Sequence, residues 1–161
     1  MSNILVDKSH TAGFSVKVGE LLKALKDKAF KDSPDEAAIF IHQTSGDENE
    51  EDMQPLTAVL FCGEKNCQNL HLQSGWYDTA NEVLSKNAII FQDYRDREDK
   101  YVIRKELIEI LNSIENKDTK VIICTTGDEG LTVLTTVLKC SDDCPSVHLL
   151  GGYNIESYNP N

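Results

Sequence analysis

Residues 120–124 hold the feature that most constrains the fold, a short run with four successive apolar side chains. The run is Lys-Val-Ile-Ile-Cys, and three of its five residues are β-branched. Continuous apolar runs of this length are typical of strands that are buried on both faces in a parallel sheet. We therefore expect residues 120–124 to form a central strand with other elements packed on both of its sides.

The rest of the chain alternates between helix-like and strand-like apolar patterns. Apolar residues recur with helical spacing in some segments and form short continuous runs in others. Helices are predicted at residues 18–25, 78–84, 103–114 and 131–138, and strands at residues 37–41, 57–61, 88–91, 120–124 and 146–150. This alternation predicts an α/β fold, with a mainly parallel sheet of about five strands flanked by helices and joined by right-handed crossovers. No internal repeat is apparent.

The length of 161 residues fits one domain. We assign residues 14–153 to that domain, residues 1–13 to an N-terminal tail and residues 154–161 to a C-terminal tail. Within the domain, residues 45–55 begin with a strongly acidic stretch that has no apolar side chain up to position 52. We expect this segment to be a mobile, solvated loop.

Charge and cysteine content exclude several classes of function. Sixteen Lys and Arg against twenty-seven Asp and Glu give a net charge of −11, which opposes binding to nucleic acid and to anionic membranes. The first ten residues lack a basic stretch followed by an apolar one. Five cysteines, an odd number, favour reduced thiols and a cytoplasmic location.

Cys124 ends the central predicted strand and is the candidate reactive residue. In open α/β sheets, ligands bind at the carboxyl ends of strands, where backbone N–H groups and a helix N-terminus support negative charge. The predicted binding loop after Cys124 consists of Thr125, Thr126, Gly127, Asp128, Glu129 and Gly130.

Two segments around this cysteine resemble a known family. Residues 121–127 (Val-Ile-Ile-Cys-Thr-Thr-Gly) and residues 147–153 (Val-His-Leu-Leu-Gly-Gly-Tyr), with a predicted helix between them, resemble the second half of a rhodanese-like domain. The similarity is closest to the non-catalytic rhodanese-like domain of MAP kinase phosphatases and their pseudophosphatase relatives. The resemblance implies an α/β fold and, in active members, a cysteine that carries sulfane sulfur.

The loop chemistry decides between the functions that this resemblance implies. Asp128 and Glu129 oppose ionisation of a nearby thiol and repel anionic sulfur donors, and Gly130 stands where Cys-based phosphatases need Arg. The first hypothesis is therefore a catalytically silent, pseudoenzyme-like domain that binds another protein in regulation or signalling. The alternative is a sulfurtransferase with Cys124 as persulfide carrier, so enzymatic activity stays open with a preference for none.

A third hypothesis is a redox or zinc module built on the other cysteines. Cys62 and Cys67 are separated by four residues, and Cys140 and Cys144 by three, which is close to the spacing of zinc ligands. The four histidines are His10, His42, His71 and His148, and we assign none of them to a metal. The prediction from the sequence is no metal site and no cofactor.

Candidate contacts to a protein partner come from two places. Arg95 and Arg97 form the densest arginine pair and suit an acidic partner surface. Trp76 and Tyr77 are either an exposed aromatic anchor or a cap on the core.

Overall fold

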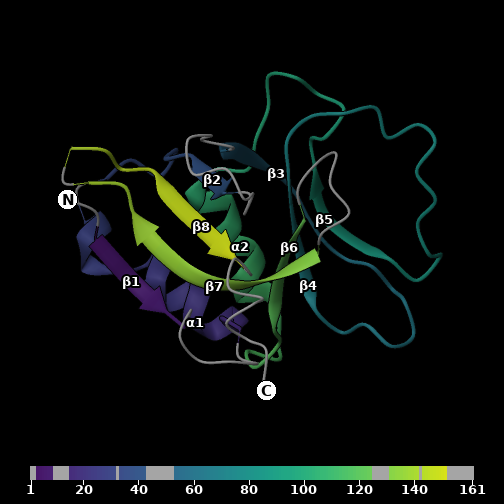
Figure 1. The fold of residues 1–161 in the computed structure, drawn as a ribbon, viewed down its shortest axis with the longest axis horizontal. Coiled ribbons are helices and arrows are strands. Elements are labelled where there is room, and N and C mark those ends of the chain that lie inside the picture. Colours follow the sequence, from purple (N-terminus) through teal and green to yellow (C-terminus); the bar gives the residue numbers. More distant parts are fainter. Residues whose placement is uncertain are drawn as a thin grey trace, which may run out of the picture.

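The computed structural model describes residues 3–8, 15–31, 33–42, 53–124, 131–141 and 143–151. In these ranges the chain forms eight strands, two short α-helices and one 3₁₀ turn (Figure 1). In chain order the elements are β1 (Asn3–Asp7), α1 (Val18–Leu25), the turn η1 (Lys28–Phe30), β2 (Ile39–His42), β3 (Met53–Phe61), β4 (Leu70–Ser74), β5 (Ile89–Asp93), α2 (Arg104–Ser113), β6 (Val121–Cys124), β7 (Leu131–Lys139) and β8 (Val147–Gly151).

Six of these strands close into a barrel. Each strand pairs with the next in the order β2, β3, β4, β6, β7, β8, and β8 pairs with β2 to complete the ring. Only the β4–β6 and β2–β8 pairs are parallel, and the other four pairs in the ring are antiparallel. The two remaining strands pair with the two longest strands of the ring, β1 with β7 and β5 with β3.

The core of the protein fills the barrel and continues to the two helices. Inward residues of β4 and β8, such as Leu72 and Leu149, are fully buried, as are Leu21 of α1 and Leu107 of α2. Burying each such leucine side chain stabilises the fold by about 1.5–3 kcal/mol. Neither of the described helices is long and apolar enough to cross a membrane.

The predicted rhodanese-like α/β fold, with a mainly parallel, helix-flanked sheet, is wrong. In the described residues eight strands accompany only two short α-helices, and most of the strand pairs are antiparallel. Residues 131–138, predicted as a helix, lie in β7, and residues 78–84 contain no helix. Five of the nine residues of β7 are Thr or Val, whose β-branched side chains favour strands, and they outweighed the leucine spacing.

Some predicted elements and boundaries fall differently in the structure. β1 lies within residues 1–13, which we assigned to a tail, and β3 begins at Met53, inside the predicted acidic loop. Residues 45–52 and 154–161 lie outside the described residues. The predicted strands at residues 37–41, 57–61, 88–91, 120–124 and 146–150 overlap β2, β3, β5, β6 and β8, and helices α1 and α2 match the predicted helical spacing.

The barrel contains an internal repeat that we did not recognise in the sequence. The first half consists of β1, α1 and the antiparallel strands β2, β3 and β4, and the second half consists of β5, α2 and the antiparallel strands β6, β7 and β8. The two parallel pairs, β4–β6 and β2–β8, join the halves. The first strand of each half pairs with the long strand of the other half, β1 with β7 and β5 with β3.

Candidate metal centre

The connection from β3 to β4 brings two cysteines to a histidine. Cys62 directly follows β3, Cys67 lies within the connection, and His71 is the second residue of β4. The antiparallel register pairs Phe61 with Leu70, so the residues on either side of this pair lie close together. Gly63 allows the sharp departure from β3 because its φ of 79° lies in the left-handed region that favours glycine.

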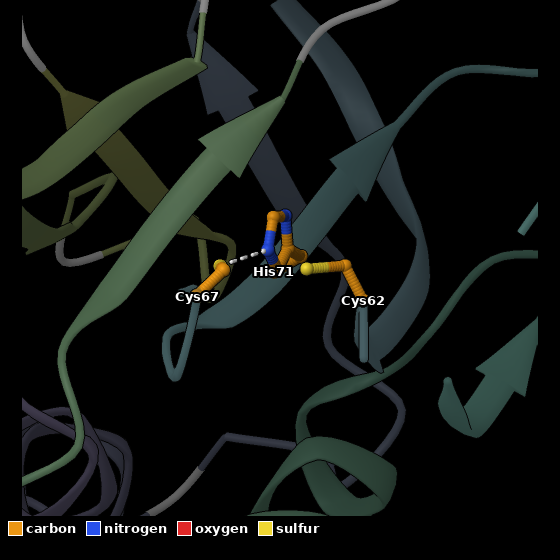
Figure 2. Close-up of side chains that lie close together, drawn as sticks. All are labelled: Cys62, Cys67 and His71. Atoms are coloured by element: carbon orange, nitrogen blue, oxygen red, sulfur yellow. Dashed lines mark hydrogen bonds between the residues drawn. The ribbon is translucent and has the colours of Figure 1, made fainter. Parts of the chain in front are cut away.

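The three side chains meet at one place, as Figure 2 shows. The Sγ atoms of Cys62 and Cys67 and a ring nitrogen of His71 all lie within 4.8 Å of one another. The Sγ of Cys67 lies 3.2 Å from the Nε2 of His71. In the part of the chain that the structure describes, this is the one group of three His, Cys, Asp or Glu ligand atoms that are so close.

A second layer of side chains holds the other edge of the His71 ring. The Sγ of Cys124 lies 3.7 Å from the Nδ1 of His71. The side chain of Gln73 hydrogen-bonds the Cys124 thiol. The Gln73 Oε1 in turn accepts a hydrogen bond of 2.5 Å from the guanidinium of Arg95. These contacts lead from His71 on β4 to Cys124 on β6, and through Gln73 to Arg95 after β5. Together they fix the orientation of the His71 ring.

The protonation state of His71 suits a metal, whereas the Cys67 thiol must lose its proton to bind one. Burial lowers the pKa of His71, so its imidazole is neutral at neutral pH, and the neutral form is the metal ligand. Burial also raises the pKa of Cys67, and the nearby Cys62 thiol adds to the rise. The Cys67 thiol therefore keeps its proton until a cation displaces it.

Cys124, the predicted catalytic residue, lies at the end of β6, where its side chain is half-buried. Burial raises its pKa to about 12, although the hydrogen bond from Gln73 and the positive charge of Arg95 act in the opposite direction. A protonated thiol is a weak nucleophile, so Cys124 is better suited to a supporting contact with His71 than to sulfur transfer. The predicted loop at residues 125–130 lies outside the described residues.

Arg95 is buried in the protein, with 1% of its surface exposed. Its guanidinium forms ion pairs with Glu82 at 2.6 Å and with Asp93 at 2.8 Å. Burial alone would lower the pKa of Arg95, but its hydrogen bonds to Asp93, Tyr77 and Glu82 raise it above the ordinary value. The structure thus gives Arg95 a supporting role behind Gln73.

The other predicted partner contacts lie near Arg95. Trp76 and Tyr77 are 38% and 37% exposed, and with Arg95 they line a cleft of about 330 Å³. The Trp76 Nε1 donates to the backbone carbonyl of Lys100, and the Tyr77 hydroxyl bonds Gln73. Arg97 is exposed.

The second cysteine pair is not part of this group. Cys140 and Cys144 follow β7, which is separated from β3 by two strands in both directions around the barrel. The residue that meets Cys62 and Cys67 is His71, which we did not assign to a metal from the sequence. The spacing Cys-x4-Cys-x3-His from Cys62 to His71 was the available signal.

Comparisons with known proteins supply no family for this chain. No family model, no curated protein and no solved structure matches it significantly.

Proposed function

We propose that this chain is a metal-binding protein that holds one Zn²⁺ through Cys62, Cys67 and His71. The observation that carries the proposal is the grouping of these three ligand atoms within 4.8 Å. Ligand atoms of a tetrahedral zinc site lie roughly 3.3–3.8 Å apart, given Zn–S bonds of about 2.3 Å and Zn–N bonds of about 2.0 Å. Small side-chain movements bring the observed group to that geometry.

The donor set favours zinc over other common cations. Thiolate and imidazole ligands suit Zn²⁺, whereas Mg²⁺ and Ca²⁺ prefer oxygen ligands. Binding displaces the thiol protons of Cys62 and Cys67 to solvent, and His71 binds as a neutral imidazole through Nε2. The contact of Cys124 with Nδ1 then supplies the outer support that zinc-bound histidines usually have.

Three protein ligands leave one coordination position for a water molecule or another donor. Cys67 lines a cleft of about 690 Å³, so such a donor has space beside the metal. Amide side chains dominate the polar lining of this cleft, namely Asn66, Gln68, Asn69, Asn87 and Asn116. The metal would link the β3–β4 connection to β4, and its fourth coordination position would face the cleft.

A disulfide between Cys62 and Cys67 is the second candidate, because the two thiols interact directly. The same atoms serve either role, and the oxidation state decides between them. A disulfide lowers the mass of the chain by about two hydrogens and removes the thiolate ligands, so intact-mass measurement separates the two functions.

The test is the metal content of the full chain purified without chelator. We expect the Cys67→Ser variant to bind one Zn²⁺ fewer per chain than the wild type. Replacing Zn²⁺ with Co²⁺ should give the visible bands of a tetrahedral site with thiolate charge transfer, and these should weaken in the variant. The control is Lys65→Ser, an exposed position in the same connection, which should leave the metal content unchanged. Equal metal content in the wild type and Cys67→Ser would refute the proposal.

The remaining expectations from the sequence stay predictions. A cytoplasmic location belongs to this proposal because free thiols are kept reduced there, and all five cysteines are free in the structure. Binding to a partner protein and sulfur transfer through Cys124 have no observation in the described residues that favours them.

A further inference from the structure

The two halves of the barrel repeat the same backbone contacts at matching positions. Four hydrogen bonds of one half have a counterpart in the other, which fixes the residue correspondence without any sequence alignment. Each of these bonds runs from the N–H of the first residue named to the carbonyl of the second. The matching bonds are Val18–Thr119 and Arg104–Ala37, Val16–Leu134 and Val102–Leu56, Lys8–Thr135 and Tyr94–Thr57, and Leu70–Lys120 and Val147–Ala38. Two isolated bridges follow the same rule, Lys17 with Lys120 and Ile103 with Ala38.

This correspondence places a second histidine where His71 lies. β3 and β4 pair Leu60 with His71, and β7 and β8 pair Leu138 with His148. His148 is therefore the second residue of β8, just as His71 is the second residue of β4.

The two cysteines of the second half correspond in the same way. Cys140 directly follows β7 as Cys62 directly follows β3. Cys144 stands four residues before His148, as Cys67 stands four residues before His71. The connection is one residue shorter in the second half, and a turn closes it with hydrogen bonds between the backbones of Ser141 and Cys144.

The outer support of the ring is repeated too. Cys124 ends β6 and contacts Nδ1 of His71 on the neighbouring parallel strand β4. His42 ends β2, and its Nε2 contacts Nδ1 of His148 on the neighbouring parallel strand β8. Nε2 of His148, which corresponds to the nitrogen that meets Cys67 in His71, lies on the other edge of the ring.

We propose a second zinc site, formed by Cys140, Cys144 and Nε2 of His148, with His42 as the supporting residue at Nδ1. The thiols of Cys140 and Cys144 already hydrogen-bond each other, and the two imidazoles already meet. In the structure these are two separate pairs, so the site closes when the thiol pair reaches the His148 ring. Binding sends two thiol protons to solvent and needs no oxidant.

The inference uses the ligand set of the proposed function, but the two sites are tested separately. The full chain is loaded with Zn²⁺ alone, and bound metal per chain is measured for the wild type, Cys62→Ser/Cys67→Ser and Cys140→Ser/Cys144→Ser. We expect two ions in the wild type and one in each double variant.

The other outcomes distinguish the failure of each site. One ion in the wild type that remains in Cys140→Ser/Cys144→Ser overturns the second site and leaves the first. One ion that remains in Cys62→Ser/Cys67→Ser and is lost in Cys140→Ser/Cys144→Ser supports the second site and overturns the proposed function. No bound ion in the wild type, or a Cys140–Cys144 disulfide that persists under reducing conditions with Zn²⁺ present, overturns the second site.

A measurement on the wild type covers the case in which a double variant does not fold. Cd²⁺ in place of Zn²⁺ should give two ¹¹³Cd resonances, with scalar coupling to the cysteine β protons of Cys62 and Cys67 in one and of Cys140 and Cys144 in the other. A single resonance without coupling to Cys140 and Cys144 overturns the second site.

His42 has its own test as a positioning residue. His42→Gln should weaken Zn²⁺ binding at the second site by about 10–100-fold and leave two ions per chain at saturation. The first site should keep its affinity. An unchanged affinity at both sites contradicts the role given to His42.

Discussion

The Sγ of Cys124 faces Nδ1 of His71 at 3.7 Å, while Cys67 approaches Nε2 of the same ring at 3.2 Å. One histidine thus connects a thiol at the end of β6 with a thiol in the β3–β4 connection. Cys124, which has the features of a nucleophile in the sequence, contacts the ring of His71, the proposed metal ligand, in the fold. This relationship separates the roles of the two cysteines and makes them testable.

Loss of the Cys124 side chain should weaken Zn²⁺ binding at the first site without abolishing it. We expect Cys124→Ala to lower the Zn²⁺ affinity of the first site by about 10–100-fold, because outer partners orient the ligating imidazole. Competition titration with a chromophoric chelator measures the affinity, and metal analysis at saturation measures the stoichiometry. Cys124→Ser, which keeps a hydrogen-bonding atom, should lose less Zn²⁺ affinity than Cys124→Ala. If Cys124→Ala instead lost the ion entirely, Cys124 would be a ligand.

The Asp93–Arg95 pair should make stability depend on pH. Hydrogen bonds from Arg95 hold the pKa of Asp93 below its ordinary value of 3.8, so the folded state favours the ionised carboxylate. This contribution is complete above the unfolded-state pKa and is lost as the pH falls through the folded-state pKa. Asp93→Asn should cost about 1–3 kcal/mol of unfolding free energy at pH 7, and the difference from the wild type should shrink below pH 4.

Urea denaturation from pH 7 to pH 3 measures this effect. The control is Asp96→Asn, which removes an exposed carboxylate close by in the chain and should change stability little at any pH. Parallel pH curves for the wild type and Asp93→Asn would contradict the coupling of Asp93 to Arg95.

Gly63 should be needed for both stability and metal binding. A Cβ at this position would clash with the backbone carbonyl carbon of Asn87, and the Gly63 φ of 79° disfavours other residues. We expect Gly63→Ala to destabilise the fold by about 1–3 kcal/mol and to weaken the first metal site, because Cys62 is its neighbour. Gly75 has the same φ outside this connection, so Gly75→Ala should reduce stability and leave Zn²⁺ affinity unchanged. Normal zinc affinity in Gly63→Ala would show that the connection tolerates displacement.

The closed barrel predicts equal roles for two leucines that are far apart in sequence. Leu72 of β4 and Leu149 of β8 occupy equivalent inward positions, and both are fully buried. Leu72→Ala and Leu149→Ala should each cost about 2–5 kcal/mol in chemical denaturation. Val83→Ala is the control, since Val83 is 93% exposed and should change stability by less than about 0.5 kcal/mol. A small effect at either leucine would contradict the shared core.

Local patterns predicted much of the secondary structure but not how it assembles. The spacing of Val18, Leu21 and Leu25 located α1, and continuous apolar runs located β2 and β6. β7 has leucines at positions 131, 134 and 138, a spacing that also fits a helix, and only pairing with β1, β6 and β8 decides between the two. Barrel closure depends on such contacts between distant segments, which a helix–strand alternation does not specify.

The candidate site was visible only in part. The sequence drew attention to Cys62, Cys67 and Cys124, but it grouped the first two with Cys140 and Cys144 because cysteine spacing is a local signal. Cys-x3-His recurs at Cys67–His71 and at Cys144–His148, and its meaning depends on the equivalence of the two halves, which the sequence pattern alone does not show. The role of Arg95 depends on burial behind Gln73, which follows from packing and not from its charged neighbours in sequence.

X-ray absorption at the zinc edge tests the central claim most directly. The sample is the Zn²⁺-loaded chain with Cys140→Ser/Cys144→Ser, so that only the first site is measured. The account predicts two sulfur neighbours at about 2.3 Å and one imidazole nitrogen at about 2.0 Å, with a further light atom in the fourth position. A first shell of oxygen and nitrogen without sulfur would contradict a zinc site at Cys62, Cys67 and His71.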